Sequence, residues 1–125
     1  MTTIPSERVV VLGASPKPER YSNQAVRLLL KHGHQVIPVH PAVERIEGLK
    51  VAASLAEAVG PIDTVTMYVG PGRSDAMADE LIASAPRRVI FNPGSENPGL
   101  ANRLTDAGIG VEEACTLVLL NTGQF

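Results

Sequence analysis

The sequence predicts a three-layer α/β fold, in which helices cover both faces of a five-stranded parallel sheet. Short, almost continuous runs of Val and Ile alternate with helical patterns along the chain. Such runs are typical of strands buried on both faces, and their alternation with helices favours right-handed crossovers between parallel neighbours. The length of 125 residues suits a single domain, residues 1–125, that buries a real core.

Five strands are expected. The first, residues 9–13, is an apolar run that ends in glycine. The others are predicted at residues 35–39, 64–69, 88–92 and 109–112. Their favoured order across the sheet is 3-2-1-4-5, as in doubly wound folds. The order 2-1-3-4-5 stays open as the alternative, because the sequence alone does not decide between the two.

A first helix is predicted over residues 22–32. Ser22 is expected to cap its start, and Gly33 to take the left-handed conformation that ends it. The stripe expected to face the sheet consists of Ala25, Val26, Leu29 and Leu30. This helix follows the first strand directly, so its N-terminus is expected at the carboxyl edge of the sheet.

Three further helices and an ambiguous tail complete the prediction. A short helix is expected over residues 54–59, and a longer one from Arg73 or Ser74 to just before Pro86. Asn97 followed by Pro98 predicts a capped helix start, and Gly108 its end. Within the tail, residues 114–120 suit a short closing helix.

Composition and charge exclude several classes of function. The net charge of −2 gives no basic footprint for duplex nucleic acid, and 3% aromatic residues without tryptophan argue against a single-strand stacking platform. One cysteine, no export signal and no membrane-length apolar run lead us to expect a cytoplasmic protein that neither carries an internal disulfide nor enters a membrane. His32 and His34 lack further ligands nearby, so no metal site is expected.

Ligand contacts are expected at the carboxyl ends of the strands, where parallel α/β sheets bind their ligands. The segment after the first strand has the strand–glycine–helix order of a phosphate-binding loop, although it carries one glycine of the three in the dinucleotide fingerprint. Its candidate contacts are Gly13, Ala14, Ser15, Lys17, Arg20, Tyr21 and Ser22. The alternative is a plain strand-to-helix turn with solvent-facing cations.

The end of the second strand bears on the type of nucleotide. NAD-binding folds usually place Asp or Glu there to hold the ribose hydroxyls, whereas this chain reads His40-Pro41. A neutral or cationic side chain tolerates a phosphorylated ribose better than a carboxylate does. Arg45 and Lys50 in the same loop are candidates to neutralise that phosphate, and the alternative is a proline-shaped loop with exposed charges.

These motifs, in this order, resemble the small stand-alone CoA-binding domains, which share a Rossmann-like fold with the N-terminal domain of the succinyl-CoA synthetase α subunit. The resemblance rests on residues 9–20, 33–41, 48–55 and 113–116, and so extends over nearly the whole chain. It implies CoA as the ligand, with pyrophosphate at residues 13–15, adenosine near His40 and Pro41, and the pantetheine arm across Val69, Gly70 and Pro71. His40 stands where family members often carry Asn.

The expected function is non-catalytic binding of CoA or an acyl-CoA, because the sequence shows no complete catalytic set. Asn92 is a further candidate contact, and Cys115 is either a reactive thiol near the ligand or simply buried. One alternative is an NAD(P)-binding, oxidoreductase-like domain. Another is an unliganded interaction module that binds a second copy or another protein through its apolar tail, residues 117–125.

Overall fold

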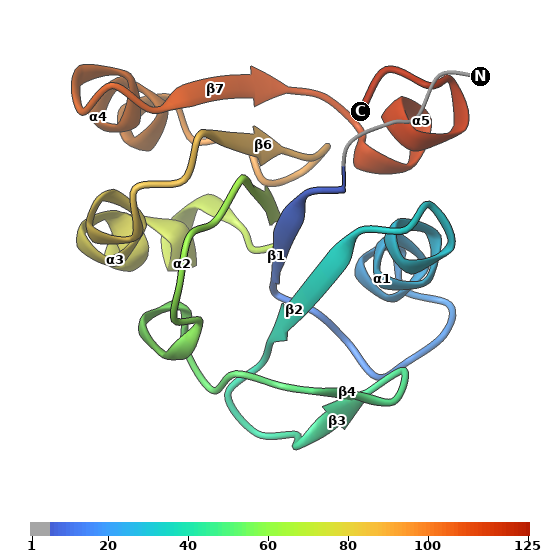
Figure 1. Ribbon diagram of the computed structural model, residues 1–125. Coiled ribbons are helices and arrows are strands. Elements are labelled where there is room, and N and C mark those ends of the chain that lie inside the picture. The colour runs from blue at the N-terminus through green and yellow to red at the C-terminus, as the bar shows by residue number, and fades with distance from the viewer. Residues whose placement is uncertain (1–5) are drawn as a thin grey trace.

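The computed structural model describes residues 6–125 as a parallel sheet between two layers of helices (Figure 1). The sheet consists of β1 (Arg8–Leu12), β2 (Gln35–Val39), β5 (Thr64–Met67), β6 (Arg88–Phe91) and β7 (Gly110–Glu113). All five strands lie within two residues of their predicted bounds. The predicted three-layer, Rossmann-like α/β fold is confirmed.

The strands lie in the order β2-β1-β5-β6-β7, and every pair is parallel. Counted among the five predicted strands, this order is 2-1-3-4-5, the alternative. The difference from 3-2-1-4-5 arises because the segment after β2 pairs with it through a single parallel bridge, Val39 to Ala52. When the segment around Ala52 is counted as a rudimentary third strand, β5 and β6 become the fourth and fifth strands. The order from that edge is then 3-2-1-4-5, followed by β7, as in Rossmann-like folds.

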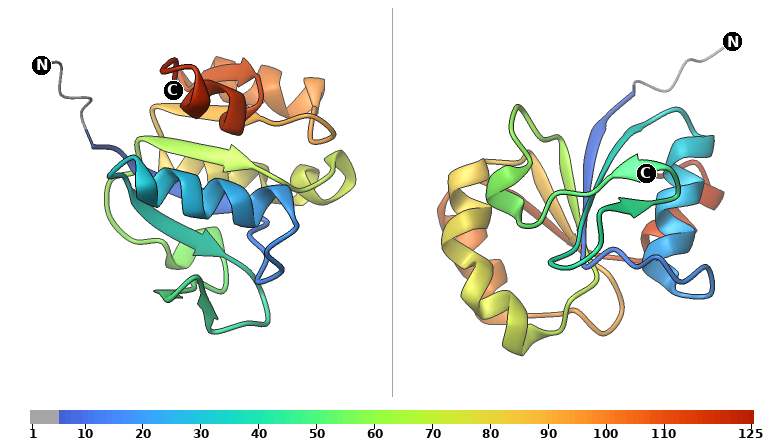
Figure 2. Two further views of the ribbon diagram at one scale, coloured as in Figure 1. Left: turned by 90° about the vertical axis from the view of Figure 1, so that its right-hand side faces the viewer. Right: turned by 90° about the horizontal axis from the view of Figure 1, so that it is seen from below.

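Helices cover both faces of this sheet (Figures 1 and 2). One face carries α1 (Tyr21–Lys31) and α5 (Thr116–Asn121), which lie against each other. The other face carries α2 (Pro71–Ser74), α3 (Ala78–Ser84) and α4 (Pro98–Asp106) with the 3₁₀ turns η1 (Leu55–Glu57) and η2 (Asp75–Met77). Neither layer forms without the sheet, because most of these helices are too short to be stable alone.

The inner strand β1 contributes to the core on both faces of the sheet. Val9 and Val11 pack toward α1, while Val10 and Leu12 pack toward α3 and α4, and all four are at most 2% exposed. Alternate side chains of a strand point to opposite faces, so a strand buried on both faces has to be apolar throughout. This is why the unbroken Val-Val-Val-Leu run predicted a strand buried on both faces.

Two helix predictions need correction. The N-cap of α1 is Arg20, whose side chain caps nothing, and Ser22 lies buried inside the first turn. Leu30 is 37% exposed instead of belonging to the buried stripe, although Gly33 ends the helix at φ +83° as predicted. The helix predicted over residues 54–59 is only the 3₁₀ turn η1, because Gly60-Pro61 leaves too little chain for a full α-helix.

The later helices follow the prediction more closely. Asn97 caps α4 by accepting a hydrogen bond from the Leu100 amide at 3.1 Å, and Gly108 follows the helix at φ +82°. The helix predicted to begin at Arg73 or Ser74 instead begins at Pro71 and is divided into α2, η2 and α3. The closing helix is α5.

A small hairpin, which the sequence interpretation missed, follows β2. Its strands are β3 (Arg45–Ile46) and β4 (Leu49–Lys50), joined by Glu47 at φ +49° and Gly48 at φ +77°. Two successive positive φ angles are typical of a type I′ hairpin turn. Ile46 is 1% exposed and anchors the hairpin in the α1 side of the core.

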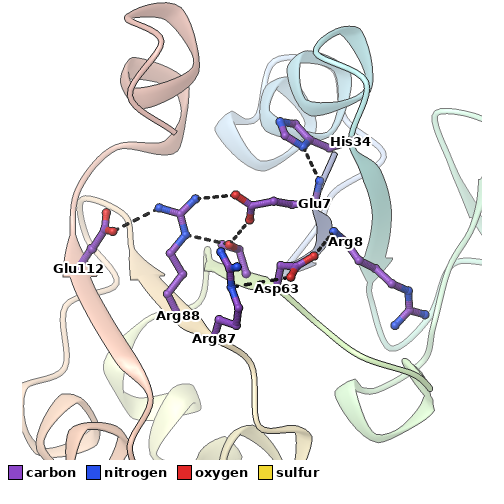
Figure 3. Close-up of polar contacts among 8 residues, drawn as sticks. Glu7, Arg8, His34, Asp63, Arg87, Arg88 and Glu112 are labelled. Carbon is purple, nitrogen blue, oxygen red and sulfur yellow. Dashed lines mark hydrogen bonds and ion pairs between the residues drawn. The ribbon is translucent and has the colours of Figure 1, made fainter. Parts of the chain in front are cut away.

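A polar network closes the amino end of the sheet, opposite the carboxyl ends of the strands (Figure 3). Arg88 donates hydrogen bonds to Thr64 Oγ1 at 2.8 Å and to Glu112 Oε1 at 3.2 Å. It also forms an ion pair with Glu7 at 3.4 Å, and its guanidinium lies 4.5 Å from the ring centroid of Phe125. The network therefore joins three strands and the end of the chain.

Acid is expected to destabilise the protein through His34, which lies in this region. Its Nδ1 accepts a hydrogen bond from the Glu7 amide at 3.0 Å, and burial lowers the pKa of His34 below its ordinary value of 6.5. A lowered pKa means that the unfolded chain takes up the proton first. The neutral ring's contribution is therefore complete above pH 6.5 and is lost as the pH falls through the folded-state pKa.

Urea unfolding between pH 5 and pH 8 measures this effect. We expect His34→Asn to flatten the pH dependence in that range, because an Asn carbonyl oxygen accepts the same amide hydrogen without titrating. His32→Asn, at an exposed position two residues away, is the matched control. An unchanged slope in His34→Asn would contradict the assignment.

Candidate functional site

A cavity of about 610 Å³ opens at the carboxyl end of β1 and β5, beside the first turn of α1. It is lined by Gly13, Ala14, Ser15, Pro16, Lys17, Arg20, Tyr21, Ser22, His40, Pro41, Tyr68 and Arg73. We call it the main cavity. Every predicted contact of the first loop lines it, as do His40 and Pro41, so the fold brings these two separate predictions together.

Gly13 is required here by packing. Its φ is +89°, and a Cβ built on it would lie 2.8 Å from Val69 Cγ1 and 2.9 Å from the Tyr68 carbonyl oxygen. The loop after β1 thus passes directly against the end of β5. The contact of Gly13 with the end of β5 excludes every larger residue, so packing alone requires this glycine.

The amides of the first loop are only partly free. The Ala14 amide donates to the Val39 carbonyl at 3.1 Å, and the Lys17 amide donates to Ser15 Oγ at 3.1 Å. The Ala14 amide is therefore not free to bind a ligand. No side chain among residues 6–125 caps α1, so the positive end of that helix faces the main cavity.

Asn23 fixes the shape of this loop. It is fully buried, and its Nδ2 donates to the Ser15 carbonyl at 2.9 Å and to Glu47 Oε2 at 3.2 Å. Its Oδ1 accepts from Arg27 Nε at 2.9 Å. One side chain thus joins the first loop, α1 and the tip of the β3–β4 hairpin.

The charged lining of the main cavity is entirely basic. Lys17 and Arg20 come from the first loop, and Arg73 comes from α2 on the opposite side. No Asp or Glu is among the lining residues within the described chain. Three cations and an uncapped helix start together favour an anion that carries more than one negative charge.

Tyr68 is a lining residue that the sequence interpretation missed. Burial raises the pKa of its hydroxyl to about 12, so the group remains an O–H donor at any physiological pH. Among residues 6–125 this hydroxyl oxygen is the buried side-chain polar atom to which no hydrogen bond is assigned. Its neighbours are the Thr66 and Thr116 hydroxyls, which bond to each other at 2.8 Å and do not line the main cavity. Tyr68 therefore lines the cavity through atoms other than its hydroxyl.

Two smaller cavities adjoin the main one. A cavity of about 500 Å³ shares His40 and Pro41 with it and adds Glu44, Arg45 and Lys50. We call it the loop cavity. A narrower slot of about 110 Å³ shares Gly13, Pro41 and Arg73 with the main cavity and is otherwise lined by Leu12, Val39, Ala53, Ser54, Leu55, Val69, Met77 and Glu80.

The sequence matches the family model of the CoA binding domain over residues 7–121. The chain belongs to the CoA-binding domain family. A crystal structure of an uncharacterized protein matches with a TM-score of 0.93 and 34% identity, covering 98% of this chain and all of that one (100%). A hypothetical protein from Pyrococcus horikoshii matches with a TM-score of 0.88 and 27% identity, covering 94% of this chain and 83% of that one.

Two further similarities cover only part of the other protein. An uncharacterized Bacillus subtilis protein, YneT, is 32% identical over 77 residues, which are 62% of this chain and 57% of the relative. The acetyl-coenzyme A synthetase 1 of Ca. Korarchaeum cryptofilum contains a region with a TM-score of 0.76 and 20% identity, which covers 86% of this chain and 25% of the synthetase. At that identity the synthetase shares the fold of the CoA-binding domain family.

Three of the predicted contacts, Gly70, Pro71 and Asn92, line none of the three cavities of this CoA-binding domain. Gly70 and Pro71 lie at the start of α2, and Val69 lines only the slot. Asn92 is 2% exposed. Its amide nitrogen donates to Thr66 Oγ1 at 2.7 Å and to the Met67 carbonyl at 2.9 Å, while its oxygen accepts from the Thr116 amide at 2.8 Å. Asn92 thus joins β5, β6 and α5.

The remaining chemical candidates are placed as follows. Cys115 is partly buried at the start of α5 and lines none of the three cavities. In the apolar tail, Leu120 is buried and Phe125 packs against His34 and Arg88, whereas Val118 is 55% exposed. Residues 6–125 contain no group of three or more potential metal ligands, and no helix in that range is long and apolar enough to cross a membrane.

Proposed function

We propose that this protein binds CoA or an acyl-CoA without catalysing a reaction on it, with the phosphates in the main cavity. The observation that carries the proposal is the lining of that cavity at the start of α1, where Lys17, Arg20 and Arg73 are the charged residues and none of the lining residues between 6 and 125 is acidic. Membership of the CoA-binding domain family supports the choice of ligand. A volume of about 610 Å³ is within the range of small-molecule sites.

The three cavities suit different parts of CoA. The pyrophosphate is assigned to the main cavity, beside Lys17, Arg20 and the start of α1. The slot is assigned to the adenine ring, because its walls are mainly aliphatic and Glu80 can accept from the exocyclic amino group. The loop cavity, with Arg45 and Lys50, is assigned to the 3′-phosphate.

Under this proposal, three contacts differ from those that the resemblance implied. Val69 is assigned to the adenine instead of the pantetheine arm because it lines the slot, and Gly70 and Pro71 are assigned no contact because they line none of the three cavities. The pantetheine arm leaves the main cavity past Tyr68. His40 and Pro41 keep their place beside the adenosine, because both line the main and the loop cavity.

Isothermal titration of the nucleotide-free protein with CoA, acetyl-CoA, dephospho-CoA and NAD tests the proposal. We expect CoA and acetyl-CoA to bind, dephospho-CoA to bind at least about tenfold more weakly because a charge-assisted contact of about 1.5 kcal/mol is lost, and NAD to give no heat. The thioester of acetyl-CoA is expected to stay intact during incubation with the protein, as followed by release of free thiol.

Variants of the basic lining sharpen this test. Lys17→Ala and Arg73→Ala are each expected to weaken CoA binding about tenfold through loss of one charged contact. Lys31→Ala, which removes the same charge at the opposite end of α1, is the control and should bind normally. Binding of NAD alone would favour an oxidoreductase-like site, and no binding to any of the four ligands would overturn the proposal.

A further inference from the structure

The orientation of the His40 ring is fixed by its own loop. Its Nδ1 accepts hydrogen bonds from the backbone amides of Ala42, at 3.0 Å, and Val43, at 3.2 Å. A ring nitrogen that accepts an N–H carries no proton itself. In this arrangement the neutral ring therefore bears its single hydrogen on Nε2.

That Nε2–H group is free to meet a ligand. Among residues 6–125, His40 forms hydrogen bonds through Nδ1 and its backbone, and none through Nε2. If Nε2 were buried, it would be a buried polar atom without a partner, and in the described chain only the Tyr68 hydroxyl is such an atom. Nε2 is therefore accessible. Because His40 lines both the main cavity and the loop cavity, its Nε2–H is available at their junction.

The side chains around this junction are chiefly donors. Arg45 and Lys50 line the loop cavity, with Glu44 as its one acidic residue in the described chain. A ribose hydroxyl is best held by a carboxylate that accepts its hydrogen, as in NAD-binding folds. The Nε2–H group cannot accept that hydrogen, but it can donate to a phosphate oxygen.

We infer that His40 determines specificity for a phosphorylated ribose by donating its Nε2–H to the 3′-phosphate of CoA. The same side chain holds the turn at residues 40–43, through which the chain reaches Arg45 and Lys50. His40 thus has two separable roles, one as an acceptor toward its own loop and one as a donor toward the ligand. The inference rests on the proposed function.

Three substitutions separate the two roles. His40→Asn keeps both an acceptor for the loop amides and a donor for the ligand. His40→Asp keeps the acceptor but places a carboxylate beside the phosphate. His40→Ala removes both the acceptor and the donor. His32→Asp makes the same change at an exposed position outside the three cavities and is the control.

The measurement is the ratio of the Kd for dephospho-CoA to the Kd for CoA, by isothermal titration. We expect the ratio to be kept in His40→Asn and His32→Asp and to fall at least tenfold in His40→Asp. His40→Ala should weaken both ligands because the loop loses its anchor. Thermal unfolding identifies any variant that fails to fold, and long-range ¹H–¹⁵N spectra of the unaltered protein should show the ring hydrogen on Nε2.

A folded His40→Asp variant with an unchanged ratio would overturn the inference, as would a ring hydrogen on Nδ1. Failure of the proposed function gives a different result. The unaltered protein would then bind neither CoA nor dephospho-CoA, and both the ligand and the role of His40 toward it would be rejected.

Discussion

Replacement of Gly13 by alanine is expected to destabilise the protein by about 2–4 kcal/mol. Alanine at a positive φ costs about 1 kcal/mol, and forcing a methyl group into a packed site costs about 1–3 kcal/mol more. Here φ is +89°, and the methyl carbon would lie 2.9 Å from the Tyr68 carbonyl oxygen, a backbone atom that moves only if β5 moves. Urea unfolding monitored by circular dichroism measures the loss.

Gly94 provides the matched control. Its φ of +92° is nearly the same, but a Cβ built there meets nothing within 4 Å. Gly94→Ala should therefore cost only the conformational part, about 1 kcal/mol. Equal losses in the two variants would mean that the contact between the first loop and β5 contributes nothing, and the packing explanation for Gly13 would fail.

Removal of Arg88 is expected to cost about 3 kcal/mol. Its side chain is 16% exposed, as is that of its ion-pair partner Glu7, and Thr64, to which it donates, is fully buried. Breaking a buried pair by removing one member leaves the other charge uncompensated, which typically costs about 3–5 kcal/mol, and the residual exposure places this pair at the lower end. Urea unfolding of Arg88→Ala at pH 7 measures the effect.

An exposed ion pair serves as the comparison for Arg88. Arg103 contacts Asp79 at 3.0 Å, but the two side chains are 55% and 96% exposed. Arg103→Ala should change stability by less than about 0.5 kcal/mol, because solvent screens such pairs. If the stability lost in Arg88→Ala comes from the uncompensated Glu7 carboxylate, adding Glu7→Gln should restore part of that stability. Additive losses of stability in the double variant would show that the uncompensated charge is not the cause.

Much of the fold could be predicted because the buried strands and the helix ends have local signatures. The unbroken apolar run of β1 predicted a strand buried on both faces, and Asn97-Pro98 predicted a capped helix. The strand order could not be predicted with the same certainty. It depends on how much of the segment around Ala52 pairs with β2, and a single bridge leaves almost no pattern in the sequence.

The placement of polar side chains around the candidate site was harder to predict for a different reason. A polar residue at the carboxyl end of a strand predicts a ligand contact, but Asn92 uses its side-chain donor and acceptor within the core. Tyr68 was missed for the converse reason, since a tyrosine after a buried strand resembles ordinary packing. Only the three-dimensional arrangement shows which polar atoms already have partners.

The contacts of Asn23 have a consequence for how a ligand is received. Since this one side chain bonds the Ser15 carbonyl, the Glu47 carboxylate and Arg27, the first loop and the hairpin tip are held in place before any ligand arrives. A loop that is already ordered loses little conformational entropy on association, so more of each contact's energy is expressed as affinity. Asn23 thus preorganises a site that it need not touch.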